Sequence, residues 1–242
     1  MKHAEQPALD LCVEGVHKRY GPAVALAGVD LTAGAGTHLL LAGANGAGKT
    51  TLLRLLAGLT GPTEGHVTID GEDPRRSTSR RQLLGLLSHQ TLLYDDLTAA
   101  ENLRFFAGLY GLPADTVIAA LASVELGEYA QARVGGFSRG MKQRLALARA
   151  TLHAPRVLLL DEPFTGLDRS SARALSCRLL ERTGEAGVSS VLVTHNVEEA
   201  THFVNRVVVL RGGRIVCDEP WADGDGSELQ ALCDHHQETE TP

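Results

Sequence analysis

The stretch Gly43-Ala-Asn-Gly-Ala-Gly-Lys-Thr50 decides the fold, because it is a complete phosphate-binding loop of the form G-x-x-x-x-G-K-[ST]. The apolar run Thr37–Ala42 before it is typical of a buried strand, and Thr51–Ala57 after it has helical spacing. A glycine-rich turn can also be a plain strand-to-helix connection. The order strand, loop, helix is the context that the motif requires, so we predict a nucleotide-binding α/β domain.

This loop has the chemistry to hold a triphosphate. Its glycines let backbone N–H groups turn inward with no Cβ in the way, and the N-terminus of the following helix adds donors and a positive dipole end. Lys49 would bridge the β- and γ-phosphates, and the Thr50 hydroxyl would ligate Mg²⁺. The predicted contacts with ATP in this stretch are Gly43, Ala44, Asn45, Gly46, Ala47, Gly48, Lys49, Thr50 and Thr51.

Bulk composition excludes several classes of protein. The 242 residues can form one large α/β domain, and no apolar run approaches the roughly 20 residues that a membrane-spanning helix needs. The N-terminus lacks the hydrophobic region of a signal peptide, so we expect a cytosolic chain. A net charge of −6 argues against non-specific binding of nucleic acid. The four cysteines are scattered with no C-x-x-C pairing, which suggests neither a zinc site nor a disulfide framework.

Strands and helices alternate on both sides of the loop, which predicts a mostly parallel sheet with helices on both faces. A small antiparallel strand group precedes the loop, and apolar residues at helical spacing indicate an inserted helical subdomain at about 95–153. We assign the α/β core to about 1–90 and 154–220, and a loose, flexible tail to 221–242. The predicted strands outside the loop are Leu9–Tyr20, Ala23–Leu31, His66–Asp70, Leu83–Ser88, Val157–Leu160, Ser189–Thr194, Arg206–Leu210 and Arg214–Asp218.

Two acids, Asp161 and Glu162, directly follow the buried strand Val157–Leu160. In open parallel sheets, ligands bind at the carboxyl ends of the strands, where the phosphate loop also lies. Asp161 can hold hydrated Mg²⁺, and Glu162 can polarise the water that attacks the γ-phosphorus. Such acids can also simply begin a loop or cap a helix, but their pairing with a phosphate loop favours a hydrolytic site.

The stretch Phe137-Ser-Arg-Gly-Met141 leads into Lys142–Arg149, and the acidic pair follows soon after. This order resembles the ATPase subunits of ABC transporters, whose signature is commonly L-S-G-G-Q. The resemblance covers Leu9 to about Asp218. It implies a head-to-tail dimer in which ATP lies between one subunit's phosphate loop and the other's Ser138, Arg139 and Gly140. Ser138 is also a good N-cap and could serve only in that role.

The chain departs from the family pattern at two signature positions. Arg139 stands where the family usually has glycine, and Met141 where it usually has glutamine. Met141 cannot donate a hydrogen bond to nucleotide, so that contact is lost or is made by backbone. Arg139 either adds charge near the phosphates or points outward. Hydrolysis is still expected, at a rate that these two residues leave open.

Other residues match the family one by one. His195 ends a predicted strand and resembles the histidine that contacts the γ-phosphate, and Gln90 matches the glutamine that senses Mg²⁺. Asp168 resembles the acid of a loop that crosses the dimer interface, and Tyr20 the aromatic that stacks on adenine. Each also has a structural alternative: a satisfied histidine, a helix N-cap for Asp168, and plain packing for Tyr20.

The resemblance implies an ATP hydrolase that powers export through a separate membrane permease, and a protein that is peripheral on the cytoplasmic face of the inner or plasma membrane. A homodimer is the simpler expectation and a heterodimer the alternative. The stretches Ser88–Gln90 and Leu97–Phe105 are similar to the ATP-binding subunit of the heme exporter of cytochrome c biogenesis. They also resemble multidrug and lipid exporter ATPases.

Two rival classes use the same loop. A soluble ABC ATPase acting on nucleic acid or the ribosome usually has two cassettes or long coiled coils, and neither is visible here. A P-loop kinase or GTPase is disfavoured by the signature, the acid pair and His195, and a guanine-specific N-K-x-D is absent. The metal-capable residues of Cys233-Asp-His-His236 lie in the predicted loose tail with no partner cluster, so we predict no metal site there.

Overall fold

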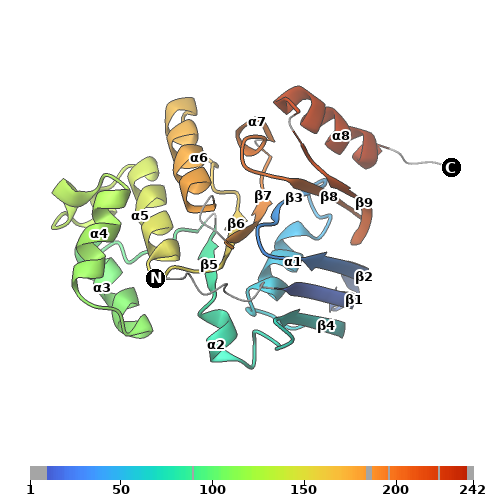
Figure 1. Cartoon of the computed structure of the whole chain (residues 1–242), viewed down its shortest axis with the longest axis horizontal. Coiled ribbons are helices and arrows are strands. Elements are labelled where there is room, and N and C mark those ends of the chain that lie inside the picture. Colours follow the sequence, from blue (N-terminus) through green and yellow to red (C-terminus); the bar gives the residue numbers. More distant parts are fainter. Residues whose placement is uncertain (1–9, 89, 184–186, 196, 223, 239–242) are drawn as a thin grey trace, which may run out of the picture.

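A small antiparallel sheet forms the N-terminal edge of the molecule (Figure 1). The computed structural model describes residues 10–88, 90–183, 187–195, 197–222 and 224–238. Strands β1 (Leu11–Tyr20), β2 (Ala23–Ala33) and β4 (Glu64–Ile69) pair in the order β2-β1-β4. The hairpin closes at Gly21-Pro22, where Tyr20 pairs with Ala23, so the predicted antiparallel group is confirmed.

The larger sheet has six strands in the order β5-β6-β7-β3-β8-β9. They are β5 (Leu84–Leu87), β6 (Val157–Asp161), β7 (Ser189–Val193), β3 (His38–Ala42), β8 (Arg206–Arg211) and β9 (Arg214–Pro220). Neighbouring strands are parallel except for β9, which turns back antiparallel to β8. Because β3 and β6 are neighbours of β7 on opposite sides, the phosphate loop after β3 and the acids after β6 reach the same edge of the sheet.

The central strands are buried on both faces, which is why they read as continuous apolar runs. In β3, Leu39 and Leu41 pack in one hydrophobic cluster with α1 (Lys49–Leu56), while Leu40 and Ala42 face a second cluster. This second cluster takes in residues of α6 (Arg169–Thr183) and α7 (Val197–Ala200). The mostly parallel α/β core expected from the sequence is confirmed.

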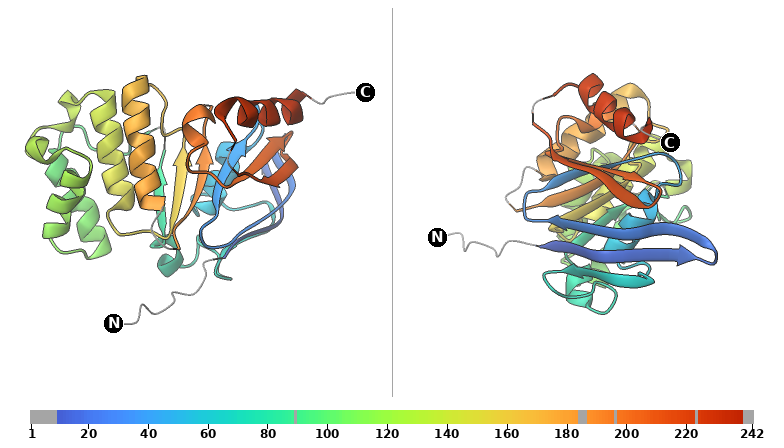
Figure 2. Two further views of the ribbon diagram at one scale, coloured as in Figure 1. Left: turned by 45° about the horizontal axis from the view of Figure 1, so that its top comes forward. Right: turned by 90° about the vertical axis from the view of Figure 1, so that its right-hand side faces the viewer.

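A helical subdomain projects to one side of the sheets (Figures 1 and 2). It contains α3 (Ala99–Tyr110), α4 (Asp115–Ser123) and α5 (Arg139–Thr151), with two 3₁₀ turns at Gly127–Tyr129 and Val134–Gly136. Thr98 and Glu101 form a reciprocal capping box at the start of α3. The subdomain has its own hydrophobic cluster around Leu103, Leu121 and Leu145, so the helical insertion predicted between the core strands is present.

The prediction of a loose tail from residue 221 is wrong over 226–238, where the chain forms α8 (Gly226–Glu238). Leu229 and Cys233 of α8 are 0 % and 1 % exposed and join the second core cluster. The Gly, Asp and Glu content of this segment suggested a loose chain, but its few apolar residues share one helical face and bury it. Asp225 caps the helix, accepting hydrogen bonds from the N–H groups of Ser227 and Glu228.

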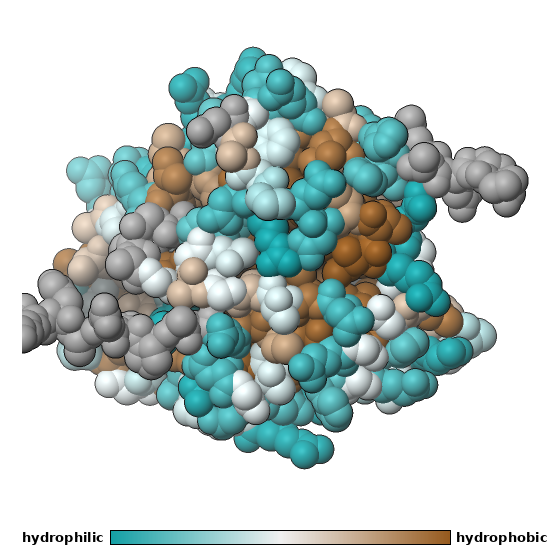
Figure 3. All heavy atoms as spheres, turned by 45° about the vertical axis from the view of Figure 1, so that its right-hand side comes forward, coloured by the Kyte–Doolittle hydropathy of each residue, from teal (hydrophilic) through white to brown (hydrophobic). Residues whose placement is uncertain are grey.

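The surface carries both hydrophobic and hydrophilic side chains (Figure 3). Figure 3 shows one face on which hydrophobic side chains are interspersed with hydrophilic ones, as on most folded domains. Within the described residues, no helix is both long and apolar enough to span a bilayer. The short helix α2 (Thr78–Arg81) precedes β5 and completes the elements.

Candidate functional site

The phosphate loop connects the end of β3 to α1, and two of its glycines are required by the space around them. A Cβ on Gly43 would lie 2.2 Å from the Leu210 carbonyl oxygen, and one on Gly48 would lie 2.5 Å from that of Ala25. Both have positive φ, +142° and +109°. Gly48 is the N-cap of α1 and offers no side-chain acceptor, so the first N–H groups of the helix are available to an anion.

Lys49 lies across the loop, with only 7 % of its surface exposed. Its ammonium donates hydrogen bonds to the carbonyl oxygens of Gly43 and, at 3.0 Å, Ala44. Burial lowers the pKa of Lys49 below its ordinary value, and the negative charges of Glu162 and Asp161 partly offset this. A buried ammonium held by two carbonyl oxygens, with two carboxylates nearby, is suited to a polyanionic ligand.

Thr50 and Asp161 come together from different elements, the first turn of α1 and the end of β6. The Thr50 hydroxyl donates to Asp161 Oδ1 at 3.4 Å, and Asp161 is 5 % exposed. A hydroxyl and a carboxylate side by side are hard oxygen donors of the kind Mg²⁺ prefers, with waters completing its coordination. These two residues therefore fit the predicted magnesium site.

Glu162 has a left-handed backbone conformation, and one oxygen of its carboxylate accepts two hydrogen bonds. Its φ is +52°, a left-handed conformation that is strained for a side chain of this size, and its N–H donates to the Val193 carbonyl at 2.8 Å. Oε2 accepts hydrogen bonds from the Thr165 hydroxyl at 3.2 Å and from the His195 backbone N–H at 3.3 Å. The left-handed turn thus aims the carboxylate away from the strand and toward the loop.

The second carboxylate oxygen, Glu162 Oε1, is buried and has no hydrogen-bond partner among the described residues. The imidazole Nε2 of His195 lies 3.4 Å from it, a contact that becomes an ion pair when the histidine is protonated. A buried acceptor without a donor is costly and is expected to bind a polar group from outside the chain.

One open pocket of about 590 Å³ collects these groups. Lys49, Thr50, Asp161, Glu162 and His195, all predicted site residues, line it together. Tyr20 stands at its rim, 49 % exposed, with the Lys18 ammonium 4.9 Å above the ring centroid. The complete lining is Tyr20, Ala25, Asn45, Gly46, Gly48, Lys49, Thr50, Thr51, Asp161, Glu162, Thr165, Val193 and His195.

Other predicted residues lie outside this lining. Gly43, Ala44 and Ala47 belong to the phosphate loop but do not line the pocket. Gln90 is exposed, and its backbone carbonyl accepts a hydrogen bond from the Ser88 hydroxyl. Ser138 and Gly140 line a separate cavity of about 240 Å³ between α5 and α6. The signature is therefore not part of its own subunit's pocket.

The structural roles anticipated for Ser138 and Asp168 are both present. Ser138 caps α5, its hydroxyl accepting from the Met141 N–H at 3.2 Å. Asp168 caps α6, accepting from the Ser171 N–H at 2.8 Å, and these hydrogen bonds lower the pKa of its carboxyl. A capping residue can also contact a ligand or a partner subunit, so the roles predicted for Ser138 at the nucleotide and for Asp168 at the dimer interface stay predictions.

Arg139 is turned toward its own chain. Its Nε donates to the Thr165 carbonyl at 2.9 Å, and its side chain covers Gly166, where a Cβ would lie 2.4 Å from that nitrogen. The Thr165 hydroxyl in turn holds Glu162. The unusual arginine thus joins the start of α5 to the residue that supports the predicted catalytic carboxylate.

Sequence reasoning missed Thr165 as a support for Glu162, and Ala25 and Val193 as pocket walls. Thr165 follows Glu162 by three residues, a spacing that a tight turn brings into contact, and this was the only available signal. Ala25 and Val193 are apolar residues in strands and carry no local signal of a site.

Comparison with known proteins agrees with this site. Residues 26–165 match the family model described as ABC transporter. The chain is 39 % identical over 211 residues to the Fe(3+) ions import ATP-binding protein FbpC of Mesorhizobium japonicum, covering 84 % of this chain and 58 % of that protein. It is 36 % identical over 194 residues to the ABC transporter ATP-binding protein NatA of Bacillus subtilis, covering 78 % of each. It is 38 % identical over 217 residues to the Nod factor export ATP-binding protein I of Burkholderia lata, covering 88 % and 71 %.

Solved structures extend the similarity to three dimensions. A dimeric, post-hydrolysis ATP-binding cassette bound to ADP and Pi superposes with a TM-score of 0.79 at 27 % identity, covering 88 % of this chain and all of the other. An ATP-binding subunit of an ABC transporter gives a TM-score of 0.81 at 27 % identity, covering 93 % and 99 %. The chain spans less than two thirds of the length of the iron import protein and nearly all of these solved chains.

Proposed function

The chain belongs to the ABC transporter family, and from this premise we propose that it is a subunit that binds and hydrolyses ATP to drive a separate membrane permease. The observation that carries the proposal is the gathering of Lys49, Thr50, Asp161, Glu162 and His195 around one pocket at the carboxyl edge of a parallel sheet. These are the groups needed to hold phosphates, ligate a metal and activate water.

Binding is assigned to the loop and α1. The N–H groups of the loop and of the first turn of α1 donate to the phosphate oxygens, and Lys49 exchanges its two carbonyl partners for the β- and γ-phosphates. Mg²⁺ bound by Thr50 and Asp161 would neutralise charge between these phosphates. Tyr20 offers a ring at the rim of the pocket on which adenine can stack.

Hydrolysis is assigned to Glu162. Its Oε1 has no hydrogen-bond partner among the described residues, and we assign it to accept a hydrogen bond, and then a proton, from the water that attacks the γ-phosphorus, which requires the adjacent His195 ring to move aside. Thr165 and the His195 N–H hold Oε2 in place. The imidazole of His195 lies beside Oε1 and is positioned to donate to the γ-phosphate. Gln90 lies outside the lining of this pocket, so a role for it requires a rearrangement of its loop.

A head-to-tail dimer supplies the missing part of the site. Ser138 and Gly140 line a different cavity from Lys49, so in one subunit the signature does not face its own phosphate loop. A partner copy can present the N-terminus of its α5, with Ser138, Arg139 and Gly140, to the γ-phosphate. Structurally similar ATP-binding cassettes that were solved as dimers support a dimer for this chain. A homodimer is the simplest assembly because this chain carries both halves.

The cargo and its direction belong to the permease. The stretch Leu97–Phe105 suggested heme export, whereas the relatives above are named for import of iron and export of Nod factor. We therefore propose a transport role on the cytoplasmic face of a membrane without restricting it to export, and heme becomes one cargo to test.

The hydrolysis proposal is tested with purified protein. Lys49→Ala should abolish binding of a fluorescent ATP analogue and release of phosphate. Arg80→Ala, which removes a guanidinium paired with Asp70 and Glu72, should leave both unchanged. Equal activity in the Lys49→Ala protein and the wild type would refute the assignment of the pocket.

The transport proposal is tested by capture of partners. Tagged Glu162→Gln protein is purified with ATP from solubilised native membranes, and the co-purified proteins are identified by mass spectrometry. Recovery of a polytopic permease supports the proposal, and the kind of permease identifies the cargo class. Recovery of ribosomal or nucleic-acid-binding proteins without a membrane protein would leave an ATPase of another kind.

A further inference from the structure

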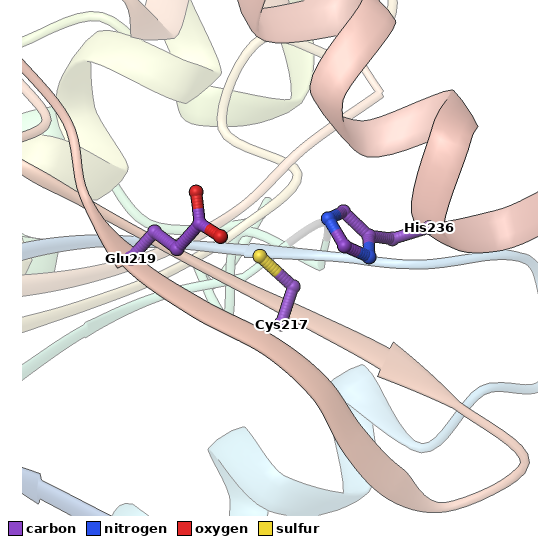
Figure 4. Close-up of side chains that lie close together, drawn as sticks. All are labelled: Cys217, Glu219 and His236. Carbon is purple, nitrogen blue, oxygen red and sulfur yellow. The ribbon is translucent and has the colours of Figure 1, made fainter.

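Three side chains with metal-binding atoms meet outside the nucleotide pocket, between β9 and α8 (Figure 4). The Cys217 sulfur, a Glu219 carboxylate oxygen and a His236 ring nitrogen all lie within 4.8 Å of one another. Cys217 is 6 % exposed, His236 is half-buried and Glu219 is exposed, so the cluster opens to solvent on one side. None of the three lines the ATP pocket.

This cluster joins residues from two elements, β9 and α8, that the fold brings together. Cys217 and Glu219 are two residues apart in a strand and so point to the same face of β9. That face is covered by α8, which is fixed by the buried side chains of Leu229 and Cys233. At the far end of α8, Arg211 of β8 donates to the His236 carbonyl at 3.1 Å, which holds the last turn of the helix over the end of the sheet.

The donor set matches a borderline-soft divalent cation. A thiolate, an imidazole and a carboxylate are the three ligand types that Zn²⁺ takes in proteins, at about 2.3, 2.0 and 2.1 Å. Around a tetrahedral ion such ligand atoms are about 3.3–3.7 Å apart, so from within 4.8 Å a small change of side-chain torsion brings them to that spacing. One thiolate and one carboxylate also balance the charge of a divalent ion, with the imidazole neutral.

We propose that Cys217, Glu219 and His236 form a binding site for a divalent transition-metal cation of the Zn²⁺ class, which joins α8 to β9. The fourth position is left to water, since among the residues that the structure describes the cluster comprises these three ligand atoms. From the sequence we predicted no metal site at Cys233-Asp-His-His236, because no partner cluster was visible. In the structure, the residues that lie beside His236 are Cys217 and Glu219 of β9. Cys233, which is buried in the core, is not part of the cluster.

The same three side chains could also make only a thiol-to-carboxylate hydrogen bond with a histidine nearby. The two readings differ in what happens to the thiol, because a metal ligand must lose its proton and bond to the ion. A cation bound here would link the last turn of α8, through His236, to β9, through Cys217 and Glu219. A hydrogen bond between Cys217 and Glu219 makes no such link, because both residues belong to β9. The proposal is independent of ATP hydrolysis, since it uses no residue of the nucleotide pocket.

The test uses the full chain, freed of metals with a chelator and titrated with Co²⁺ and then Zn²⁺. We expect one Co²⁺ per chain with a near-ultraviolet thiolate-to-cobalt charge-transfer band, which Zn²⁺ then displaces. Ions bound by Thr50 and Asp161 give no such band because that site has only oxygen donors. Cys217→Ser should abolish the band, and His236→Gln and Glu219→Gln should each weaken Zn²⁺ binding by more than about 10-fold.

Matched controls separate this site from non-specific binding. Cys177→Ser removes an exposed thiol on α6, and His235→Gln removes the neighbouring imidazole on α8. Both should keep the band and the Zn²⁺ affinity of the wild type. Absence of a thiolate band in the wild type, its survival in Cys217→Ser, or its loss in Cys177→Ser would overturn the proposal.

A readout that does not depend on the cysteine covers the case in which Cys217→Ser fails to fold. Zn²⁺ should raise the thermal unfolding midpoint of the wild type and of His235→Gln, because an ion that binds only the folded state stabilises it. It should not raise that of His236→Gln, whose ring lies near the surface and is not part of the core cluster. Equal shifts in all three proteins would place the cation elsewhere and overturn the site.

Discussion

Replacing Glu162 by glutamine isolates the chemical step from binding. Glutamine has nearly the same shape, and its carbonyl oxygen can still accept from the Thr165 hydroxyl and the His195 N–H, at 3.2 and 3.3 Å in the native protein. The change removes the negative charge and replaces the second carboxylate oxygen, Oε1, by an amide nitrogen that cannot act as a base. The left-handed turn at residue 162 is set by the backbone and by the hydrogen bond to Val193, so the loop should keep its course.

The expected size of the effect follows from the role assigned to this oxygen. A positioned general base contributes about 10²- to 10⁴-fold to a rate, so phosphate release by Glu162→Gln should fall by at least about 100-fold. ATP affinity should change little, because Lys49 and the loop N–H groups are untouched. With ATP bound and not hydrolysed, the protein should accumulate as an ATP-dependent dimer.

The assay pairs phosphate release with light scattering in the presence of Mg²⁺ and ATP. Thr165→Val is the graded comparison: it removes one of the hydrogen bonds to Oε2 and keeps the base, so its rate should fall by about 10-fold, since 1.4 kcal/mol is a factor of ten. Glu198→Gln removes an exposed carboxylate paired with Arg169 and should match the wild type. If Glu162→Gln releases phosphate within about 3-fold of the wild type, Glu162 is not the base and the reasoning from Oε1 fails.

Three further predictions test the loop, two half-buried histidines and α8. Gly48→Ala should lose ATP binding in a fluorescence titration, because its Cβ would lie 2.5 Å from the Ala25 oxygen at a φ of +109°; normal binding would show that the loop adjusts freely. Burial lowers the pKa of His38 and of His153 below the ordinary 6.5, so the unfolded chain binds more protons and stability should fall as pH drops below about 6.5. Urea unfolding from pH 7.5 to 5 should show a shallower decline when both are changed to glutamine, and an unchanged slope would exclude them as the cause. Leu229→Ala should lower the free energy of unfolding in urea by about 2–5 kcal/mol, and a cost below about 1 kcal/mol would mean that α8 is loosely attached.

Local spacing in the sequence was enough to predict the phosphate loop, the two acids after β6 and the helical insertion. Each of these signals is contained in a few consecutive residues: glycines that admit a tight turn, a continuous apolar run for a strand buried on both faces, and a 3.6-residue period for a helix. Their meeting in one pocket also followed from sequence, because parallel strands end at a common edge. The alternation of strands and helices therefore determined both the architecture and the place of the site.

Tertiary structure alone decided what depends on contacts between distant segments. The hydrogen bond from Arg139 to the Thr165 carbonyl depends on how α5 lies against the loop after β6. The surroundings of Glu162 Oε1, which has no hydrogen-bond partner in the described part of the chain, depend on how the end of β7 lies against the same loop. The C-terminal segment reads as polar and loose, yet it folds as α8 because the sheet offers a surface for Leu229.

Cys217 and His236 show the same division most clearly. They are 19 residues apart and their spacing matches no motif. They meet because β9 runs back antiparallel to β8 and α8 packs on the face of the sheet that these two strands form. Sequence periodicity records which face of an element is apolar, but not which other element will cover that face. Burial of those faces against each other brings distant side chains together, and that is settled only when the whole chain folds.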